Sequence, residues 1–156
     1  MDDQPHDRLL ECPRDIPRDH LRYHTRRVAV TKEFTFDAAH HLYEYAGVCK
    51  NLHGHTYRLS VTVSGHLDEH GFVIDFKDLK RVVKEAVVDN LDHRYLNAVL
   101  PPMNTTAENI VVWIFERIQT ALAARNDPRG LRVERLVLWE TPSSSAEVTR
   151  EWMEDR

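Results

Sequence analysis

Hydrophobic and polar residues alternate along two segments of the chain. Between residues 57 and 64 every second position is hydrophobic, and these positions hold Tyr57, Leu59, Val61 and Val63. In an earlier segment one parity is hydrophobic apart from Lys32, and it carries Val28, Val30, Phe34, Phe36 and Ala38. A period of two residues is typical of strands with one buried face. We therefore predict one strand that ends at His40 and a second strand that begins at His53.

Two later segments have the spacing of amphipathic helices instead. Asp75 can cap the first helix, with Asp78 three residues on. This helix is predicted to end near Asn90, with a hydrophobic stripe of Phe76, Leu79, Val82, Val83 and Ala86. The second helix follows Thr105-Thr106-Ala107-Glu108, which fits a capping box, and its stripe is Val111, Ile114, Phe115, Ile118 and Leu122.

A last long strand is expected over residues 131–140, and it is hydrophobic on both faces. Leu136 and Leu138 have one parity, whereas Val133, Val137 and Trp139 have the other. A strand of this kind lies between a helix layer and a second covering, for which another subunit is a candidate. With short additional strands near residues 72–75 and 145–149, the order predicts an α+β fold, an antiparallel four-stranded sheet with two helices on one face.

The composition indicates one domain behind an N-terminal extension. The chain has 156 residues, of which 42% are hydrophobic and 29% charged, and this length can bury a core without disulfide bonds. Residues 1–26 are polar and contain Pro5, Pro13 and Pro17. We expect them to form an extension that is flexible or draped over the surface, followed by a single domain over residues 27–156.

Charge and cysteine content narrow the classes of function. The formal net charge of −4 argues against a nucleic-acid-binding surface spread over the molecule. The two cysteines, Cys12 and Cys49, give no disulfide framework and favour a reducing compartment. Because no hydrophobic run reaches the length of a membrane span and the N-terminus lacks the features of a secretory signal, we expect a cytoplasmic protein that does not contact a membrane.

The ten histidines are the unusual feature of the composition. His53 and His55 share the face of Tyr57 and lie about 6–7 Å apart, and His40 ends the first strand on its buried face. Antiparallel pairing of the two strands would bring these imidazoles together, and three histidines with an open fourth position form a catalytic zinc site. A bulge at Ala38-Ala39 would bring His41 forward in place of His40, and imidazoles also accept iron, nickel or copper.

Several motifs occur in one order along residues 28–150. They are Phe34-Thr35-Phe36-Asp37-Ala38-Ala39-His40, Cys49-x-x-x-His53-Gly54-His55-x-Tyr57, Val73-Ile74-Asp75-Phe76, Leu91-Asp92-His93, Thr105-Thr106-Ala107-Glu108-Asn109 and Trp139-Glu140-Thr141. With these motifs the chain resembles the 6-pyruvoyl-tetrahydropterin synthase / 6-carboxytetrahydropterin synthase family. Several spaced motifs in a fixed order make this resemblance specific.

The resemblance implies a role for each matching residue. The family's three zinc ligands correspond to His40, His53 and His55. Its catalytic cysteine corresponds to Cys49, and the Asp–His pair that partners the cysteine corresponds to Asp92 and His93. The glutamate that anchors the pterin ring corresponds to Glu140, where a carboxylate can accept paired N–H bonds. Thr105, Thr106 and Glu108 are further candidates for pterin contacts.

The resemblance also implies the architecture and the substrate class. The family has the tunnelling fold, whose subunits associate through their sheets into barrels, usually as homohexamers with active sites between subunits. Its substrate is 7,8-dihydroneopterin triphosphate, and no nicotinamide or flavin is required. The sequence contains no Gly-rich dinucleotide-binding loop, in agreement with that expectation.

Other roles for these residues stay open at the level of sequence. Cys49 could be a fourth zinc ligand, which would make the site closed and structural. Asp92 and His93 could cap the end of the first helix, and the residues at 105–108 could do no more than cap the second. Three cations, Lys32, Lys50 and Arg58, are possible triphosphate contacts that the sequence does not distinguish.

The spacing between the cysteine and the histidines indicates a branch of the family. Cys49 stands four residues before His53, which is similar to the bacterial 6-carboxy-forming enzymes. The expected reaction is therefore zinc-dependent conversion of 7,8-dihydroneopterin triphosphate to 6-carboxy-5,6,7,8-tetrahydropterin, acetaldehyde and triphosphate, on the route to queuosine and other deazapurines. The alternatives are the pyruvoyl-forming reaction, which keeps the three-carbon side chain, and a zinc- and pterin-binding protein without turnover.

Overall fold

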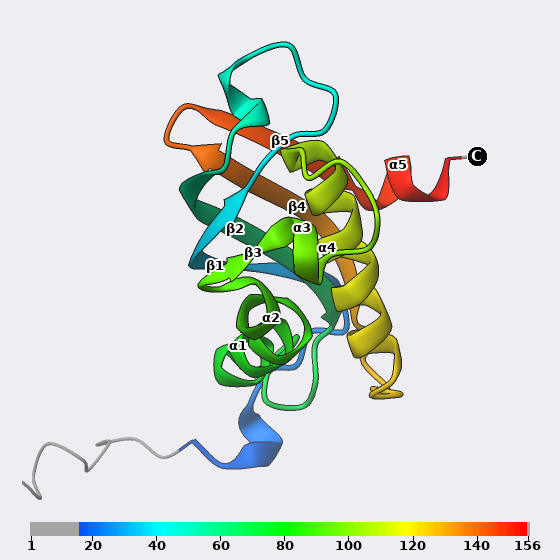
Figure 1. Cartoon of the computed structure of the whole chain (residues 1–156). Coiled ribbons are helices and arrows are strands. Elements are labelled where there is room, and N and C mark those ends of the chain that lie inside the picture. Colours follow the sequence, from blue (N-terminus) through cyan, green and yellow to red (C-terminus); the bar gives the residue numbers. More distant parts are fainter. Residues whose placement is uncertain (1–15, 156) are drawn as a thin grey trace, which may run out of the picture.

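The computed structural model describes residues 16–155. The first part of the predicted extension, residues 1–15, therefore lies outside the described residues. Residues 16–26 are mostly exposed and include a short 3₁₀ turn, Arg18–His20. They lead away from the sheet (Figure 1), and Arg18 pairs with Glu69 in the loop that follows the second strand, at 2.5 Å.

A five-stranded sheet forms one layer of the molecule, in the order β3-β1-β2-β4-β5. The strands are β1 Arg27–His40, β2 His53–His66, β3 Arg94–Tyr95, β4 Arg132–Thr141 and β5 Ser144–Thr149. The four longer strands pair antiparallel, as predicted, while β3 adds a two-residue parallel pairing at the end of β1. A strand of two residues carries no periodicity, so the prediction of four strands misses it.

The helices form a second layer against one face of the sheet (Figure 1). They are α1 Phe76–Val83, the π-helical segment Lys84–Val88, α2 Asp89–Leu91, α3 Leu96–Val99 and α4 Ala107–Ala123, and α5 Arg150–Glu154 ends the chain. Asp75 caps α1 by accepting the Lys77 backbone N–H at 2.6 Å. Among the residues described, no helix combines the length and the hydrophobicity that crossing a bilayer requires.

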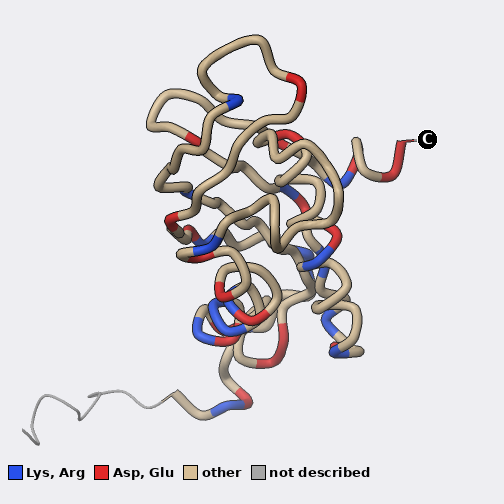
Figure 2. The backbone as a smooth tube through the Cα atoms, in the orientation of Figure 1, with Lys and Arg blue, Asp and Glu red and all other residues tan. Residues whose placement is uncertain are grey.

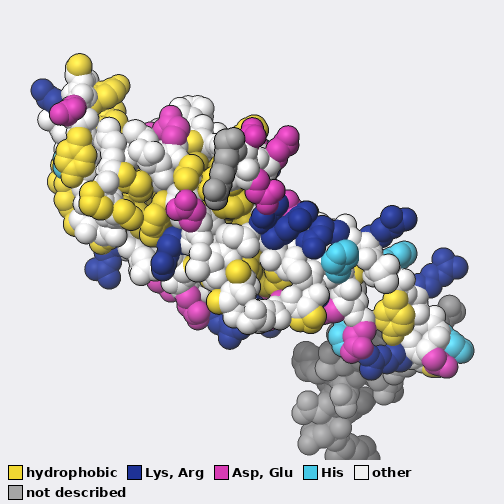
Figure 3. All heavy atoms as spheres, turned by 90° about the vertical axis from the view of Figure 1, so that its right-hand side faces the viewer, with side chains coloured by type: hydrophobic (Ala, Val, Ile, Leu, Met, Phe, Trp, Pro, Cys, Tyr) yellow, Lys and Arg dark blue, Asp and Glu magenta, His cyan; other side chains and the backbone are white. Residues whose placement is uncertain are grey.

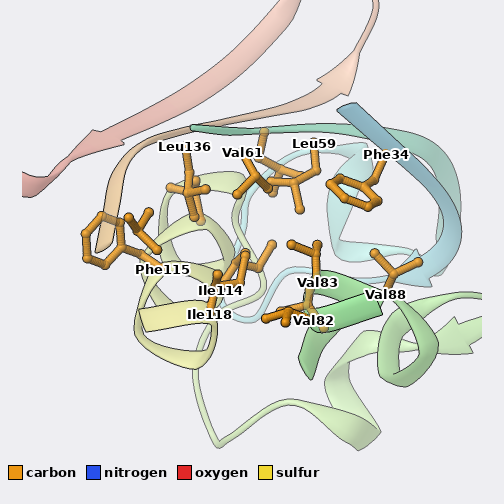
Figure 4. Packing of buried hydrophobic residues seen from close by; sticks show 14 of the residues in the cluster. Phe34, Leu59, Val61, Val82, Val83, Val88, Ile114, Phe115, Ile118 and Leu136 are labelled. Atoms are coloured by element: carbon orange, nitrogen blue, oxygen red, sulfur yellow. The ribbon is translucent and has the colours of Figure 1, made fainter. Parts of the chain in front are cut away.

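The hydrophobic core lies between the two layers (Figure 4). Side chains of the sheet, such as Leu59, Val61 and Leu136, point toward Val83 and Ile114 on the helices. All five predicted stripe residues of α4 are buried. In the stripe of α1, however, Phe76 is 53% exposed, because it is the first residue of the helix and lies at its outer edge. The periodicity thus predicted the buried face of each long element, but not its ends.

Two further predictions about the strands are wrong. Residues 72–75 form a turn before α1 and not a strand, although Val73 and Ile74 are both buried. Val133 shares the helix-facing side with Leu136, because the ladder of β2 and β4 shifts between Thr62 and Val63 and leaves one residue of β4 unpaired. A bulge reverses the parity of every residue beyond it.

The opposite face of β4 is partly buried within the chain itself. Val137 is buried there, outside the main core. The neighbouring Trp139 is covered by Arg58, whose guanidinium carbon lies 4.0 Å from the indole ring. Charges of both signs are mixed over the surface, most visibly on α1 and α2 (Figure 2), where Arg81 pairs with Asp78.

Candidate metal centre and active site

The hairpin of β1 and β2 brings three histidines together. His40 pairs with His53 and Ala38 with His55 in one uninterrupted register. The nearest ring nitrogens of His40, His53 and His55 all lie within 4.8 Å of one another, and the Nε2 atoms of His40 and His53 are 3.1 Å apart. The ladder has no bulge at Ala38-Ala39, so the alternative that placed His41 in this group is wrong.

The hydrogen bonds of these rings show that the group is suited to a cation. His40 Nδ1–H donates to the Thr105 carbonyl oxygen at 2.8 Å, and His53 Nδ1–H donates to the Asn51 carbonyl oxygen at 2.7 Å. A neutral imidazole that donates through Nδ1 presents a lone pair at Nε2. Two such lone pairs therefore face each other across 3.1 Å, which is repulsive unless a cation lies between them.

The distances agree with a metal of the size of zinc. Zn–N bonds of about 2.0–2.1 Å in a tetrahedral site place ligand atoms about 3.3–3.4 Å apart, close to the separation of His40 and His53. His55 Nε2 is buried and has no hydrogen-bond partner among the described residues. Metal-binding histidines commonly donate their second nitrogen to a carbonyl, as His40 and His53 do. The donor set thus fits a three-histidine zinc site.

Burial favours the form of the imidazoles that binds a metal. It lowers the pKa of His40, against the opposing effects of the Thr105 carbonyl and of Glu140. Burial also lowers the pKa of His55, again against Glu140. Both rings are thereby held neutral at physiological pH, and the neutral imidazole is the metal ligand.

Glu140 lies at the junction of this group and a small cleft. Its Oε1 atom is 3.5 Å from His40 Nε2 and 3.8 Å from His55 Nε2. It also lines a cleft of about 250 Å³ together with Thr106 and Glu108. Three of the four residues predicted to contact a pterin thus share one cleft.

The fourth of these residues, Thr105, lies elsewhere. It is fully buried, and besides accepting the His40 bond its hydroxyl donates to the His41 carbonyl at 3.2 Å. The predicted capping box starts one residue later, since Thr106 is the residue that caps α4, by accepting from Asn109 N–H. Thr105 is therefore placed to orient a histidine. Sequence reasoning missed this role, because it depends on how the loop before α4 packs.

Asp92 and His93 form a pair at the edge of the sheet. His93 Nδ1–H donates to Asp92 Oδ1 at 3.0 Å. Asp92 Oδ1 also accepts the backbone N–H of Asp37, and this bond is the main cause that lowers the pKa of Asp92. His93 N–H donates to the Asp37 carbonyl at 2.6 Å, and the His93 backbone has a positive φ of 56°. The end of β1 thus fixes the pair in place.

An open cleft connects this pair with the histidine group. It has a volume of about 580 Å³ and is lined by Asp37, His55, Thr56 and His93, among others. Asp37 accepts the Thr56 hydroxyl at 2.5 Å. The alternation of β1 places Asp37 on the exposed parity, so the hydrophobic pattern does not single it out.

Cys49 lies in a 3₁₀ turn, Val48–Lys50, of the loop between β1 and β2. The side chain is half-buried and is not part of the histidine group, which argues against a closed four-ligand site. The loop exposes four large hydrophobic side chains, those of Tyr43, Tyr45, Val48 and Leu52. The end of the molecule that carries it is the most hydrophobic part of the face in Figure 3.

The three candidate phosphate contacts lie in different parts of the structure. Arg58 lines a cleft of about 520 Å³ that includes His55 and Glu140. Lys32 lies instead near the ring of Phe76, 5.9 Å from its centroid, at the start of α1. Lys50 stands in the turn that carries Cys49. Only Arg58 of the three shares a described cleft with a residue of the histidine group.

Comparisons with known proteins agree with this geometry. The family model described as 6-pyruvoyl tetrahydropterin synthase matches residues 29–151. The chain is 39% identical over 142 residues to a 6-carboxy-5,6,7,8-tetrahydropterin synthase of Haemophilus influenzae, covering 76% of this chain and 96% of the relative. It is 42% identical over 120 residues to a dihydroneopterin monophosphate aldolase of Pyrococcus furiosus, covering 76% and 92%.

A solved structure shares the fold. The 6-pyruvoyl tetrahydropterin synthase of Caenorhabditis elegans superimposes with a TM-score of 0.70 at 24% identity, over 82% of this chain and 99% of that one. The match of the family model spans the histidine group, the Asp–His pair and Glu140 alike. The chain belongs to the 6-pyruvoyl tetrahydropterin synthase family.

Proposed function

We propose that the chain is a zinc enzyme that converts 7,8-dihydroneopterin triphosphate to 6-carboxy-5,6,7,8-tetrahydropterin, with release of acetaldehyde and triphosphate, on the route to queuosine and other deazapurines. The observation that carries the proposal is the meeting of three imidazoles with Glu140, beside a cleft of the size of a small ring. The Haemophilus influenzae relative and the four-residue spacing from Cys49 to His53 support the carboxy-forming branch.

The metal ion and the Glu140 carboxylate would bind different parts of the substrate. His40, His53 and His55 would hold the zinc ion, which when bound acts as a Lewis acid on substrate oxygen atoms. Glu140 would accept N–H bonds from the pterin ring through both carboxylate oxygens. Thr106 and Glu108 would contact the same ring from the other side of the cleft, while Thr105 orients His40.

Cys49 and His93 would move the protons. The Asp92 carboxylate occupies Nδ1 of His93, so Nε2 is the atom of this ring that can exchange a proton with the substrate. Cys49 would act as the second acid–base group, since a thiol becomes a usable base near a metal or an imidazolium. Arg58 is the cation best placed to meet the triphosphate.

We further propose that the protein is a homohexamer with active sites between subunits. β5 has a single neighbour in the sheet, and an unpaired edge strand is a natural place for a second subunit to add its own strand. The exposed hydrophobic residues of the Cys49 loop also support burial against another subunit. Each subunit would then complete the site of its neighbour.

The Pyrococcus furiosus relative favours a second candidate function. Its printed activity is that of a dihydroneopterin monophosphate aldolase, and an aldolase of this kind would cleave a carbon–carbon bond of the monophosphate. The same zinc group and the same Glu140 cleft would serve that reaction. The two functions differ in the phosphate chain of the substrate and in the fragment that is released.

Product analysis tests both functions. Zinc-loaded protein is incubated separately with 7,8-dihydroneopterin triphosphate and with the monophosphate, and the products are identified by mass spectrometry. We expect acetaldehyde and 6-carboxytetrahydropterin from the triphosphate. Turnover of the monophosphate alone would establish the aldolase, and a pyruvoyl product would establish the other branch of the family.

A matched variant tests the role of the thiol. Cys49→Ala is expected to retain zinc and to lose turnover by at least about a hundredfold, the range of a general acid–base group. Full activity of this variant would refute the proposed role of Cys49. Wild-type protein that binds zinc and pterin without forming any product would instead be a binding protein.

A further inference from the structure

Glu140 faces two sites at once, and its position is the basis of a second proposal. In the described structure its carboxylate lies closer to the imidazoles than to any cation of Lys or Arg, because its ion contacts within 4.0 Å are those with His40 and His55. The side chain is 28% exposed. The rest of the cleft lining, which includes Glu108 and Thr106, offers hydroxyl and carboxylate groups but no cation.

The Glu140 carboxylate lies outside the group of three mutually close histidine nitrogens but near two of them. His40 Nε2 is 3.1 Å from His53 Nε2 and 3.5 Å from Glu140 Oε1, and Oε1 is 3.8 Å from His55 Nε2. In a four-coordinate zinc site two ligand atoms lie about 3.3 Å apart. A metal ion at the centre of the three rings would therefore have the Glu140 carboxylate beside it, with a small movement of one flexible side chain completing the set.

We propose that Glu140 is a ligand of the metal while no pterin is bound, and that it leaves the metal to bind the pterin ring. This inference rests on the proposed function, in which both carboxylate oxygens accept N–H bonds from the ring. The metal and the pterin would then compete for one carboxylate, whose two oxygens cannot be directed at the metal and at both N–H groups of the ring at once. Arrival of the substrate would thus open the fourth position of the metal at the moment when the substrate needs it.

Cobalt substitution provides the test, because the visible spectrum of Co²⁺ reports the number and type of its ligands. Wild type, Glu140→Gln and the control Glu108→Gln are loaded with Co²⁺ in the absence of substrate. The control removes a charge from the same cleft but from a residue outside the histidine group. The dissociation constant of Co²⁺ is measured by competition with a chelator, alongside the absorption spectrum.

We expect Glu140→Gln to weaken Co²⁺ binding by about 10–100-fold, the range seen when a residue that supports a metal site is lost, and to shift the visible bands. Glu108→Gln should match wild type in both measurements. Unchanged affinity and spectrum in Glu140→Gln would overturn the proposal. Glu140→Asp replaces the glutamine variant if circular dichroism shows that the latter does not fold, and is held to the same expectation.

The exchange of Glu140 is tested with neopterin as the probe. Adding it to the Co²⁺-loaded wild type should move the spectrum toward that of Glu140→Gln, whereas the spectrum of the variant should stay as it is. A wild-type spectrum that never changes with neopterin would overturn the exchange. The outcome is independent of the product analysis, since a chain that makes no carboxytetrahydropterin can still show a Glu140-dependent cobalt spectrum.

Discussion

Tyr57 carries a hydroxyl whose removal should stabilise the fold. The residue is fully buried, and the hydroxyl has no hydrogen-bond partner among the described residues. Its ring stacks on Phe36 with the centroids 5.0 Å apart. Burial, together with the negative charge of Glu140, raises the pKa of the phenol, so the group stays protonated. Tyr57→Phe keeps the ring and its stacking and deletes only the hydroxyl.

The magnitude follows from the cost of an unpaired polar group. Leaving a buried donor unsatisfied costs about 1–3 kcal/mol, and the small void left by the oxygen atom offsets a few tenths of this, at about 24 cal/mol per Å³. We expect the free energy of unfolding of Tyr57→Phe to rise by about 1 kcal/mol. For a chain of this length, that change raises Tm by about 2–4 °C.

Tyr95→Phe is the matched control, because the same atom is removed from a hydroxyl that has a partner. The hydroxyl of Tyr95 lies 2.6 Å from His41 Nδ1. Losing this hydrogen bond should lower the free energy of unfolding by about 0.5–1.5 kcal/mol. The same chemical change is thus expected to act in opposite directions at Tyr57 and Tyr95.

Urea unfolding of the metal-free proteins, followed by circular dichroism and fluorescence, measures both effects. All variants are compared at one protein concentration, since subunit assembly would stabilise each by mass action, and at equal m-values, so that the midpoints report stability. A Tyr57→Phe protein that is as destabilised as Tyr95→Phe would show that the buried hydroxyl has a partner in the folded protein, and would refute the reasoning.

Three further predictions concern stability and metal binding. Arg129 lowers the pKa of Asp127 to about 2. The pair therefore stabilises the fold above the unfolded pKa near 4 and loses this effect as the pH falls toward 2. Asp127→Asn should lower the free energy of unfolding by about 1 kcal/mol at pH 7, allowing for solvent screening. A difference from wild type that is as large at pH 2 as at pH 7 in acid-unfolding curves would contradict this. Ile114→Ala, at a fully buried position of α4, should cost about 2–5 kcal/mol in urea unfolding, against less than about 0.5 kcal/mol for the exposed Val112→Ala, and equal costs would refute the described core. Zinc should raise the Tm of wild type by several degrees and leave that of His53→Ala unchanged, so a zinc-dependent shift in the variant would place the metal elsewhere.

The alternation of β1 and β2 was sufficient to predict that His40, His53 and His55 lie together. Side chains in a strand repeat every two residues, so the parity of Phe36 and of Tyr57 places His40 and His55 on the buried side. Antiparallel pairing of the two strands then brings these histidines together. The structure has this register. The geometry of the histidine group was thus encoded locally, in two segments that are close in the sequence.

The features that the sequence did not reveal depend on contacts between distant segments. The bulge in β4 moves Val133 to the helix-facing side of the sheet. No residue type in this part of the sequence predicts the bulge. Asp37 meets Asp92 only because β3 adds to the end of β1. Thr105 reaches His40 across a separation of 65 residues. In each case the partner is selected by packing and not by local periodicity.

The π-helical segment Lys84–Val88 stands between α1 and the Asp92–His93 pair. Relative to a regular α-helix, a π turn accommodates one additional residue. Each residue of an α-helix turns the chain by about 100°, so a relative that lacks this residue would present its Asp–His pair to a different side of the helix. The side to which the Asp92–His93 pair points therefore depends on one residue of the Lys84–Val88 segment. Deleting one residue of this segment would leave Asp92 and His93 in the sequence while turning them away from the cleft that they share with His55.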